Sequence, residues 1–298
     1  MKKKYLIIGE NSFIGQHLLT INKIRRNYFS LSINPKNKKN IIVNKNTILF
    51  SKIDKLFEYY GIPHTVFFLS WKGMDDIYSK KKNFYNYKIY KKLTEYFYNK
   101  KVKNIIFFGS IKEYGNKHVE LSEDLTKLNP ISYYGKYKLR VGMSGLKLAN
   151  TMKKNFLHLR ISHVFGFNKN KFKLLNKIFF QKHYKEDRDL NFFRNMIYID
   201  DLKKIILKCI DIPFNGVVNI GSNYNCIYSQ FINNYCQIAN IKNIISHPKK
   251  KILSDENYKY FNFSIKKMIK KFKFKKFTDY NIALKKIFLK QQKLFFIK

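Results

Sequence analysis

Arginine and acidic residues are scarce in this sequence. Only six of its 60 basic side chains are arginine, and Asp and Glu together number 19, which leaves a formal net charge of +41. Proteins that read nucleic acid depend on the bidentate arginine fork. Here Lys, Asn, Ile, Phe and Tyr are all abundant along the whole chain. We interpret the lysines as a solvated coat that attracts anionic ligands, and we do not expect nucleic acid as a partner.

Cysteines and long apolar runs are also scarce. The three cysteines, Cys209, Cys226 and Cys236, form no Cys-x-x-Cys pair. This argues against a disulfide scaffold or a thiolate metal site and fits a reducing compartment, so we predict no metal. No run approaches the roughly 18 apolar residues of a membrane span, and the apolar stretch behind the N-terminal lysines is too short for a signal peptide. We expect a cytoplasmic protein without a membrane span.

Short apolar strands alternate with helical segments over the first two thirds of the chain. Strands that are apolar on both faces and separated by helices predict a parallel sheet covered by helices, an α/β fold. The last third is less regular, with helical segments predicted at 265–274 and 283–292. The predicted strands are 5–8, 28–33, 47–50, 65–69, 104–108, 156–161 and 217–220. The remaining predicted helices are 13–24, 83–99 and 132–151.

The first strand runs into Gly9-x-x-Ser12-x-x-Gly15, which opens a helix. Glycine allows the sharp turn, and a position without a side chain lets a dinucleotide pyrophosphate approach the helix N-terminus. The alternative is an ordinary strand-to-helix turn. Because the motif follows the first strand, we favour a dinucleotide site.

The second strand lacks the acidic residue that would hold the ribose hydroxyls of NAD. No Asp or Glu occurs between Glu10 and Asp54. Instead, Ser32 is followed by Asn34, Lys36, Lys38 and Lys39, and Arg25 and Arg26 precede the strand. A cationic pocket with a hydroxyl suits a 2′-phosphate, so we predict NADP as the preferred cofactor and NAD as the alternative.

Tyr134 and Lys138 form a Tyr-x-x-x-Lys pair, which places both side chains on one face of a helix. The spacing occurs four times in this Lys- and Tyr-rich chain, but only Tyr134 has Pro130 and Ser132 before it and Gly135 after it. A lysine ammonium beside a phenol is expected to lower the pKa of the phenol. The pattern therefore indicates an acid–base pair.

Seven motifs occur in order, and together they resemble those of the extended short-chain dehydrogenase/reductase family, the NAD-dependent epimerase/dehydratase proteins that act on nucleotide sugars. The resemblance covers about residues 3–225, with Ser12 replacing a glycine and His163 replacing an asparagine. It implies a Rossmann-type doubly wound parallel sheet. The motifs are Gly9-x-x-Ser12-x-x-Gly15, Phe68-Leu69-Ser70-Trp71, Gly109-Ser110-x-x-Glu113-Tyr114-Gly115, Pro130-x-Ser132-x-Tyr134-Gly-x-x-Lys138, Arg160-x-x-His163-x-x-Gly166, Arg194-x-x-x-Tyr198-x-x-Asp201 and Asn219-Ile-Gly221.

The resemblance also implies roles for individual residues. Tyr134 would be the general acid/base, Lys138 would tune it and hold the nicotinamide ribose, and Ser110 would bind the reacting oxygen. Substrate binding would fall to Trp71, Ser110, His163 and Arg194, with core packing as the alternative for Trp71 and a structural hydrogen bond for His163. Cofactor binding would involve Gly9, Ser12, Phe13, Ile14, Gly15, Ser32, Leu69, Ser70, Tyr134 and Lys138.

The residues after Ser110 separate the reactions of the family. Its 4,6-dehydratases carry Asp-Glu there, whereas this chain has Ile111 and Lys112, which cannot supply acid–base groups. Glu113 lies one position later and is interpreted as a structural hydrogen-bonding group. We predict an NADPH-dependent reductase of a dTDP- or CDP-linked 4-keto-6-deoxy sugar. The alternative is an NAD-dependent nucleotide-sugar 4-epimerase, and a remote one is a non-catalytic dinucleotide- or RNA-binding protein.

The resemblance further implies a division of the chain. Residues 1–166, with a return segment at about 195–220, would form the dinucleotide-binding domain. Residues 167–194 and 221–298 would form the smaller, substrate-binding region. Family members often dimerise through a four-helix face, which here would use the helices at 83–99 and 132–151, so we expect a homodimer.

Overall fold

The computed structural model divides the chain into two compact units. The first comprises residues 1–115, 127–161 and 205–219, and the second comprises residues 116–126, 162–204 and 220–298. No helix among the described residues is long and apolar enough to cross a membrane. The structure describes residues 3–33, 43–44, 47–74, 76–117, 119–170, 173–181, 183–185, 190–244 and 262–295.

A six-stranded sheet forms the centre of the first unit, in the order β12-β8-β6-β5-β1-β2. The pairings β2–β1, β1–β5, β5–β6 and β6–β8 are all parallel, which confirms the predicted doubly wound fold. Because parallel strands share a direction, their carboxyl ends lie along one edge of the sheet. The strands are β1 (Tyr5–Ile8), β2 (Tyr28–Leu31), β5 (Thr65–Phe68), β6 (Asn104–Phe108), β8 (Asn155–Ile161) and β12 (Gly216–Ile220).

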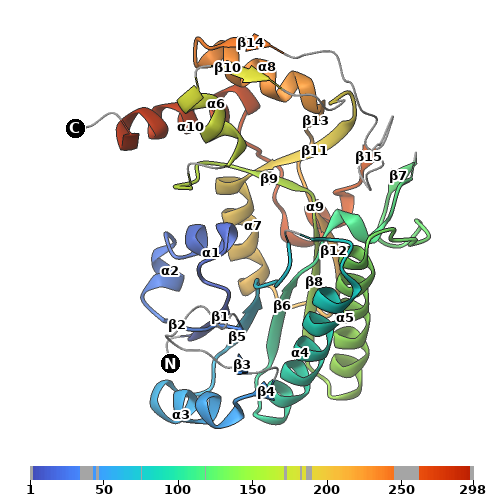
Figure 1. Ribbon diagram of the computed structural model, residues 1–298. Helices are drawn as coiled ribbons and strands as arrows, with labels where there is room; N and C mark the ends of the chain where they lie inside the picture. The colour runs from blue at the N-terminus through green and yellow to red at the C-terminus, as the bar shows by residue number, and fades with distance from the viewer. Residues whose placement is uncertain are drawn as a thin grey trace. The chain divides into compact units, whose positions relative to one another are not determined.

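Both faces of this sheet are buried. Leu6, Phe68 and Phe107 belong to a core cluster with side chains of the covering helices, and their strand neighbours Ile7 and Phe67 are equally buried. Helices α4 and α5 lie side by side on one face, and α7 lies on the other (Figure 1). The helices are α1 (Phe13–Leu18), α2 (Asn22–Arg25), α3 (Phe50–Tyr60), α4 (Lys80–Asn99), α5 (Tyr133–Thr151) and α7 (Ile199–Asp211).

Two sequence predictions for this unit are wrong. The helix predicted at 13–24 is broken between α1 and α2, where the Thr20 hydroxyl and backbone N–H both bond the His17 carbonyl. The strand predicted at 47–50 is only the two-residue β4 (Thr47–Ile48), paired with β3 (Val43–Asn44), and α3 begins at Phe50. Phe50 instead stacks on Tyr96 of α4, with ring centroids 4.4 Å apart.

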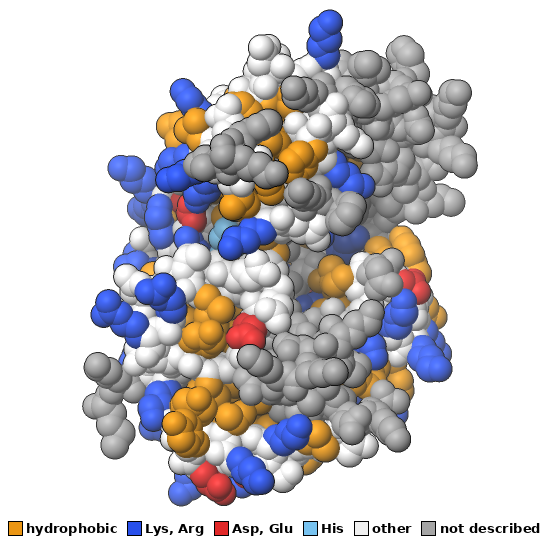
Figure 2. Space-filling model, turned by 60° about the vertical axis from the view of Figure 1, so that its left-hand side comes forward, with side chains coloured by type: hydrophobic (Ala, Val, Ile, Leu, Met, Phe, Trp, Pro, Cys, Tyr) orange, Lys and Arg blue, Asp and Glu red, His pale blue; other side chains and the backbone are white. Residues whose placement is uncertain are grey.

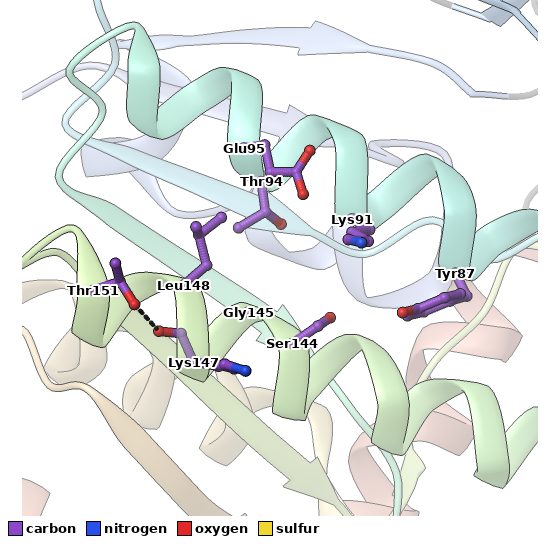
Figure 3. Close-up of a pocket in the computed structure, with 9 residues that line it drawn as sticks. All are labelled: Tyr87, Lys91, Thr94, Glu95, Ser144, Gly145, Lys147, Leu148 and Thr151. Atoms are coloured by element: carbon purple, nitrogen blue, oxygen red, sulfur yellow. Dashed lines mark hydrogen bonds between the residues drawn. The ribbon is translucent and has the colours of Figure 1, made fainter.

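A groove runs along the surface between α4 and α5. Its volume is about 320 Å³, and side chains from both helices point into it (Figure 3). The helix α4 contributes Tyr87, Lys91, Thr94 and Glu95, and α5 contributes Ser144, Gly145, Lys147, Leu148 and Thr151.

The described residues of the second unit form small sheets and four helices besides the start of α7. A three-stranded sheet has β11 (Phe193–Tyr198) at its centre, parallel to β9 (His163–Phe165) and antiparallel to β13 (Asn225–Ile227). Two-stranded sheets pair β7 (Glu120–Leu121) with β15 (Asn262–Phe263) and β10 (His183–Lys185) with β14 (Lys242–Ile244). The helices are α6 (Leu174–Gln181), α8 (Tyr228–Ile238), α9 (Lys266–Phe272) and α10 (Tyr280–Phe295).

On the face that Figure 2 shows, the basic side chains are scattered rather than gathered in one patch. Figure 2 shows blue lysine and arginine side chains spread among white and orange surface, with few red acidic ones. This distribution fits a lysine coat.

Candidate active site

The turn between β1 and α1 can pack closely against its neighbours only because it contains glycine. Gly9 has φ +103°, and a Cβ there would lie 2.6 Å from the Ser70 backbone nitrogen. A Cβ at Gly15 would lie 2.4 Å from the Gly9 carbonyl oxygen. Ser12, the departure from the glycine pattern, caps α1 by accepting a hydrogen bond from the Gly15 N–H at 3.1 Å.

The residues of this turn fit a dinucleotide pyrophosphate. The N–H groups of Phe13 and Ile14 belong to the first turn of α1, where a helix has no internal acceptors. Together with the close backbone approach at Gly9, they provide a cradle for an anion. The end of β5 lies against the same turn, because the Leu69 and Ser70 N–H groups both donate to the Ile8 carbonyl, at 3.0 and 2.9 Å.

The predicted adenosine end of this cradle is only partly described. Ser32 directly follows β2 and is half-buried, and Arg25 and Arg26 are exposed. Asn34, Lys36, Lys38 and Lys39, on which the NADP prediction also depends, lie outside the described residues.

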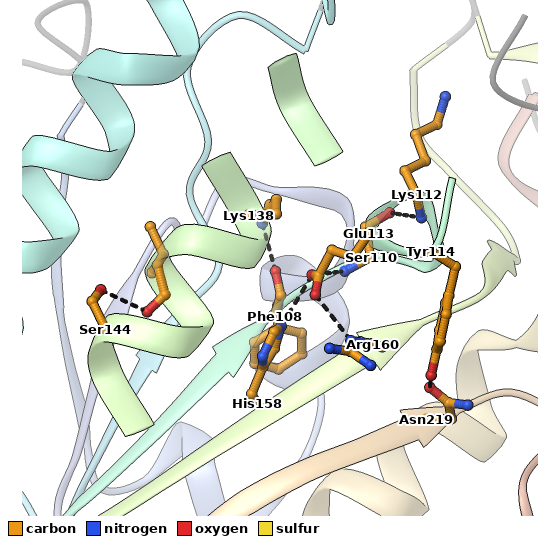
Figure 4. Close-up of polar contacts among 11 residues, drawn as sticks. Phe108, Ser110, Lys112, Glu113, Tyr114, Lys138, Ser144, His158, Arg160 and Asn219 are labelled. Atoms are coloured by element: carbon orange, nitrogen blue, oxygen red, sulfur yellow. Dashed lines mark hydrogen bonds and ion pairs between the residues drawn. The ribbon is translucent and has the colours of Figure 1, made fainter. Parts of the chain in front are cut away.

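Ser110, Tyr134 and Lys138 come together at the carboxyl end of β6. Ser110 follows β6, and Tyr134 and Lys138 occupy successive turns of α5, which is capped by Ser132. The Tyr134 hydroxyl is hydrogen-bonded to Ser110. The Lys138 ammonium donates to the Phe108 carbonyl (Figure 4) and lies 5.6 Å from the centre of the Tyr134 ring.

The pKa values of this pair differ from the sequence expectation. Burial raises the pKa of Tyr134 well above its ordinary value, the hydrogen bond from Ser110 lowers it, and the Glu113 charge raises it. Burial also lowers the pKa of Lys138 to about 7. Burial therefore outweighs the lowering expected from Lys138, and the net pKa of Tyr134 in the protein alone is raised. Lys138 points at a backbone carbonyl and is itself desolvated, so Tyr134 holds its proton at neutral pH.

Glu113 lies behind Ser110 in a fully buried network. Its carboxylate accepts the Ser110 N–H at 2.8 Å, contacts His158 Nε2 at 3.0 Å and pairs with Arg160 Nε at 3.1 Å (Figure 4). With all its contacts inside the core, Glu113 supports the 3₁₀ turn Ile111–Glu113 that carries Ser110. This confirms the structural interpretation of Glu113.

Trp71 lies against the catalytic candidates. Its Nε1–H donates to Asn83 Oδ1 at 2.8 Å, and its ring meets Tyr134 edge-on with centroids 5.7 Å apart. Lys138 Nζ lies 4.3 Å from the centre of the Trp71 ring. Sequence reasoning missed Asn83. The sequence signal that could have found it is helical spacing, because Asn83 lies on the same face of α4 as the buried residues Asn86 and Tyr90.

His163 and Arg194 form a pair within the second unit. They lie on the adjacent strands β9 and β11, and Arg194 Nη1 is 2.9 Å from His163 Nδ1. Since guanidinium can only donate, His163 accepts with Nδ1 and carries its proton on Nε2. The Arg194 guanidinium also lies 4.7 Å from the Phe192 ring and 4.5 Å from the Tyr228 ring.

Solved structures share this fold along almost the whole chain. MoeE5 in complex with UDP-glucuronic acid and NAD aligns over 98% of this chain and 99% of its own, with a TM-score of 0.78 and 17% identity. A UDP-N-acetylglucosamine 4-epimerase from Bacillus cereus aligns over 97% and 99%, with a TM-score of 0.78 and 18% identity. RMD from Pseudomonas aeruginosa with NADPH aligns over 98% of both chains, with a TM-score of 0.76 and 14% identity.

Sequence comparison identifies the family. No functionally curated protein matches the chain. The model of the NAD dependent epimerase/dehydratase family, however, matches residues 5–221. This span includes the Gly9 turn, Ser110, the Tyr134–Lys138 pair and Arg194. The chain belongs to the NAD dependent epimerase/dehydratase family, NAD(P)-dependent enzymes that modify nucleotide sugars.

Proposed function

We propose that this protein is an NADPH-dependent reductase of a dTDP- or CDP-linked 4-keto-6-deoxy sugar. The observation that carries the proposal is the buried Tyr134 hydroxyl, which is hydrogen-bonded to Ser110 and whose ring lies beside Lys138. Reduction of a ketone needs a proton donor at the carbonyl oxygen, whereas an epimerase first needs a base at a hydroxyl group. Burial raises the pKa of Tyr134 in the protein without cofactor, which supports the first task.

The residues divide the work as follows. Ser110 donates a hydrogen bond to the sugar carbonyl oxygen, and Tyr134 gives its proton to that oxygen as the new hydroxyl forms. Lys138 holds its ammonium beside Tyr134 and stabilises the negative charge that the phenol acquires. The Gly9 turn would hold NADPH, which when bound would supply the hydride that the sugar carbon accepts. The segment after β5 links the Gly9 turn to the catalytic residues. Its Ser70 lies against the turn, and its Trp71 contacts Tyr134.

A dehydratase fits this site poorly. Elimination of water needs acid–base groups directly after residue 110, where the chain has Ile111 and Lys112. Glu113 cannot replace them, because its carboxylate is fully enclosed by Ser110, His158 and Arg160.

The preferred cofactor and the residue that binds the substrate diphosphate are proposed from the sequence pattern. The missing acidic residue after β2 and the cationic segment around it favour NADP over NAD. Arg194, held by His163 and by two aromatic rings, suits the diphosphate of a nucleotide sugar, because the guanidinium fork matches phosphate oxygens. Residues 167–194 and 221–298 then form the substrate-binding region.

The second candidate is an NAD-dependent nucleotide-sugar 4-epimerase. It is favoured by the structural likeness to proteins described as UDP-N-acetylglucosamine 4-epimerase and UDP-glucose 4-epimerase, at 18% and 19% identity. The same Ser110, Tyr134 and Lys138 would serve it, with Tyr134 acting first as the base.

One assay separates the two reactions. The protein is incubated with NADPH and either dTDP- or CDP-4-keto-6-deoxyglucose, and loss of the reduced-nicotinamide absorbance is followed. The reductase proposal expects stoichiometric oxidation of NADPH. It is overturned if no ketosugar oxidises NADPH while UDP-glucose and UDP-galactose interconvert with bound NAD.

We further propose that the protein forms a homodimer and resides in the cytoplasm. The groove between α4 and α5 offers a surface for a second copy, in line with the four-helix face of the family. The three cysteines are free and buried, which suits a reducing compartment. Nucleic acid is not expected to compete for the site, because the lysines are dispersed.

A further inference from the structure

We infer that Trp71 is a positioning residue for the catalytic pair: its indole face holds the Lys138 ammonium, and its ring packs nearly at a right angle against the Tyr134 ring. This inference differs from the expectation that Trp71 contacts the sugar, and it rests on the proposed roles of Tyr134 and Lys138. The residue is the only tryptophan of the chain, so the contact can be observed directly.

The Lys138 ammonium is surrounded by aromatic faces. Its Nζ lies 4.3 Å from the centre of the Trp71 ring, 4.9 Å from that of Phe107 and 5.6 Å from that of Tyr134. The electron-rich face of an aromatic ring attracts a cation, and indole attracts it most strongly. Trp71 is the nearest of the three rings, so among them it contributes most to holding the ammonium, beside the hydrogen bond to the Phe108 carbonyl.

Trp71 is itself fixed by a loop that is attached to two helices. Asn83 of α4 accepts the indole N–H at 2.8 Å. Asn86 of α4 bonds both the N–H and the carbonyl of Lys72, at 2.9 and 2.8 Å. Farther along the loop, the Ile77 carbonyl accepts the Tyr134 N–H at 2.9 Å. The loop thus fixes Trp71 and the first turn of α5 together.

The groups facing Lys138 oppose one another. Burial favours the neutral amine, whereas the Phe108 carbonyl, the Glu113 carboxylate and the aromatic faces favour the ammonium. Tyr134, the other titratable neighbour, is neutral. The balance leaves the pKa of Lys138 at about 7, so its charge changes in a convenient pH range, directly over the indole.

Tryptophan emission tests the contact without any substrate. In the unliganded protein, the Trp71 emission should change sigmoidally between about pH 5 and 9, with a midpoint near 7. The change should disappear in Lys138→Met. It should persist in Lys136→Met, a matched loss of charge on the same helix, because Lys136 Nζ lies over Tyr133 instead, 5.3 Å from its centre. An unchanged titration in Lys138→Met, or none in the wild type, overturns the inference.

Kinetics test the consequence for the reaction, with NADPH and a ketosugar that the wild type reduces. Trp71→Leu should lower kcat by about tenfold or more, the scale expected for displaced catalytic groups, while KM for the sugar nucleotide stays within about twofold. Trp71→Phe should recover part of kcat, because it restores an aromatic face. A raised KM with unchanged kcat would instead place Trp71 against the sugar and overturn the inference.

The two experiments also separate this inference from the proposed function. If no nucleotide sugar is turned over but the emission titration depends on Lys138, the proposed function fails and the Trp71–Lys138 contact stands. If turnover is normal and the titration is absent, the proposed function stands and the role of Trp71 fails.

Discussion

At the scale of single residues, burial decides which proton is available. Tyr134 and Lys138 are both almost fully buried, and desolvation favours the neutral form of each. The phenol therefore keeps its proton, while the amine lies close to half protonation at neutral pH. The pair is prepared to give a proton, with the ammonium form stabilising the charge that remains.

Removing the Tyr134 hydroxyl tests this role. Tyr134→Phe should lower kcat by about 10²- to 10⁴-fold, the contribution typical of a positioned general acid. NADPH affinity should change by less than about twofold, because the ring still fills its place beside Trp71. Steady-state kinetics and a binding titration measure the two effects.

Tyr133→Phe is the matched control for Tyr134→Phe. Tyr133 is the preceding residue of α5, is half-buried, and stacks on Tyr137 rather than on the catalytic groups. It should leave kcat within about twofold, as expected for a side chain outside the site. Comparable losses in the two variants would mean that disturbance of α5, and not the missing proton, causes the effect.

At the scale of elements, α5 can carry Tyr134 and Lys138 to the end of β6 only because it packs closely on the sheet. A Cβ at Gly142 would lie 2.1 Å from His158 Nδ1, and one at Gly145 would lie 2.3 Å from the Phe156 ring. These glycines weaken the helix intrinsically by about 1 kcal/mol each, but they allow the close approach.

Gly142→Ala should therefore destabilise the protein even though alanine is the better helix former. The added methyl group meets the buried His158 ring, and overpacking of this kind costs about 1–3 kcal/mol. Urea denaturation measures the loss. Met143→Ala, at an exposed position of the same helix, should change the free energy of unfolding by less than about 0.5 kcal/mol. Stabilisation by Gly142→Ala would show that α5 has room to move.

The Glu113 network gives the site a defined dependence on pH. Although burial raises the pKa of Glu113, the charges and hydrogen bonds of His158 and Arg160 and the Ser110 N–H bring it below its ordinary value of 4.5. The ionised carboxylate thus contributes stability above pH 4.5, and this is lost as pH falls through the folded-state pKa. The wild type should lose stability in that acidic window.

Glu113→Gln should cost about 3 kcal/mol at pH 7, because Arg160 loses its buried partner. Its stability should then fall less than that of the wild type on acidification. Chemical denaturation at pH 7 and at about pH 4 measures both. Glu120→Gln, which breaks the exposed pair with Lys266, should match the wild type at both pH values. Parallel pH curves for Glu113→Gln and the wild type would contradict this account.

The parts of the site that could be predicted are those written in local motifs. The Gly9 turn and the Tyr134–Lys138 pair follow from local spacing, and Ser110 follows from the family resemblance. The helix α7 could also have been predicted from the sequence, because Leu202, Ile205 and Ile206 recur at helical spacing. The partners of Glu113 could not, since Arg160 lies 47 residues farther along the chain and only the tertiary fold brings the two together.

At the scale of the whole molecule, the charge opposes the proposed dimer. The helices α4 and α5 carry ten basic residues and one acidic residue, Glu95. Two copies joined through the groove between these helices would bring surfaces of the same sign together. The attraction must then come from apolar contacts such as those of Tyr87 and Leu148, which line the groove.

This balance predicts that salt strengthens the dimer. Screening shortens the range of repulsion from about 14 to about 4 Å as ionic strength rises from roughly 50 to 500 mM, so the dimer dissociation constant should fall several-fold. Sedimentation equilibrium at both ionic strengths measures it. Ser144→Arg, in the groove, should weaken the dimer, whereas Leu125→Arg, at an exposed position in the second unit, should not. A dimer that salt weakens, or that Ser144→Arg leaves intact, would place the interface on another surface.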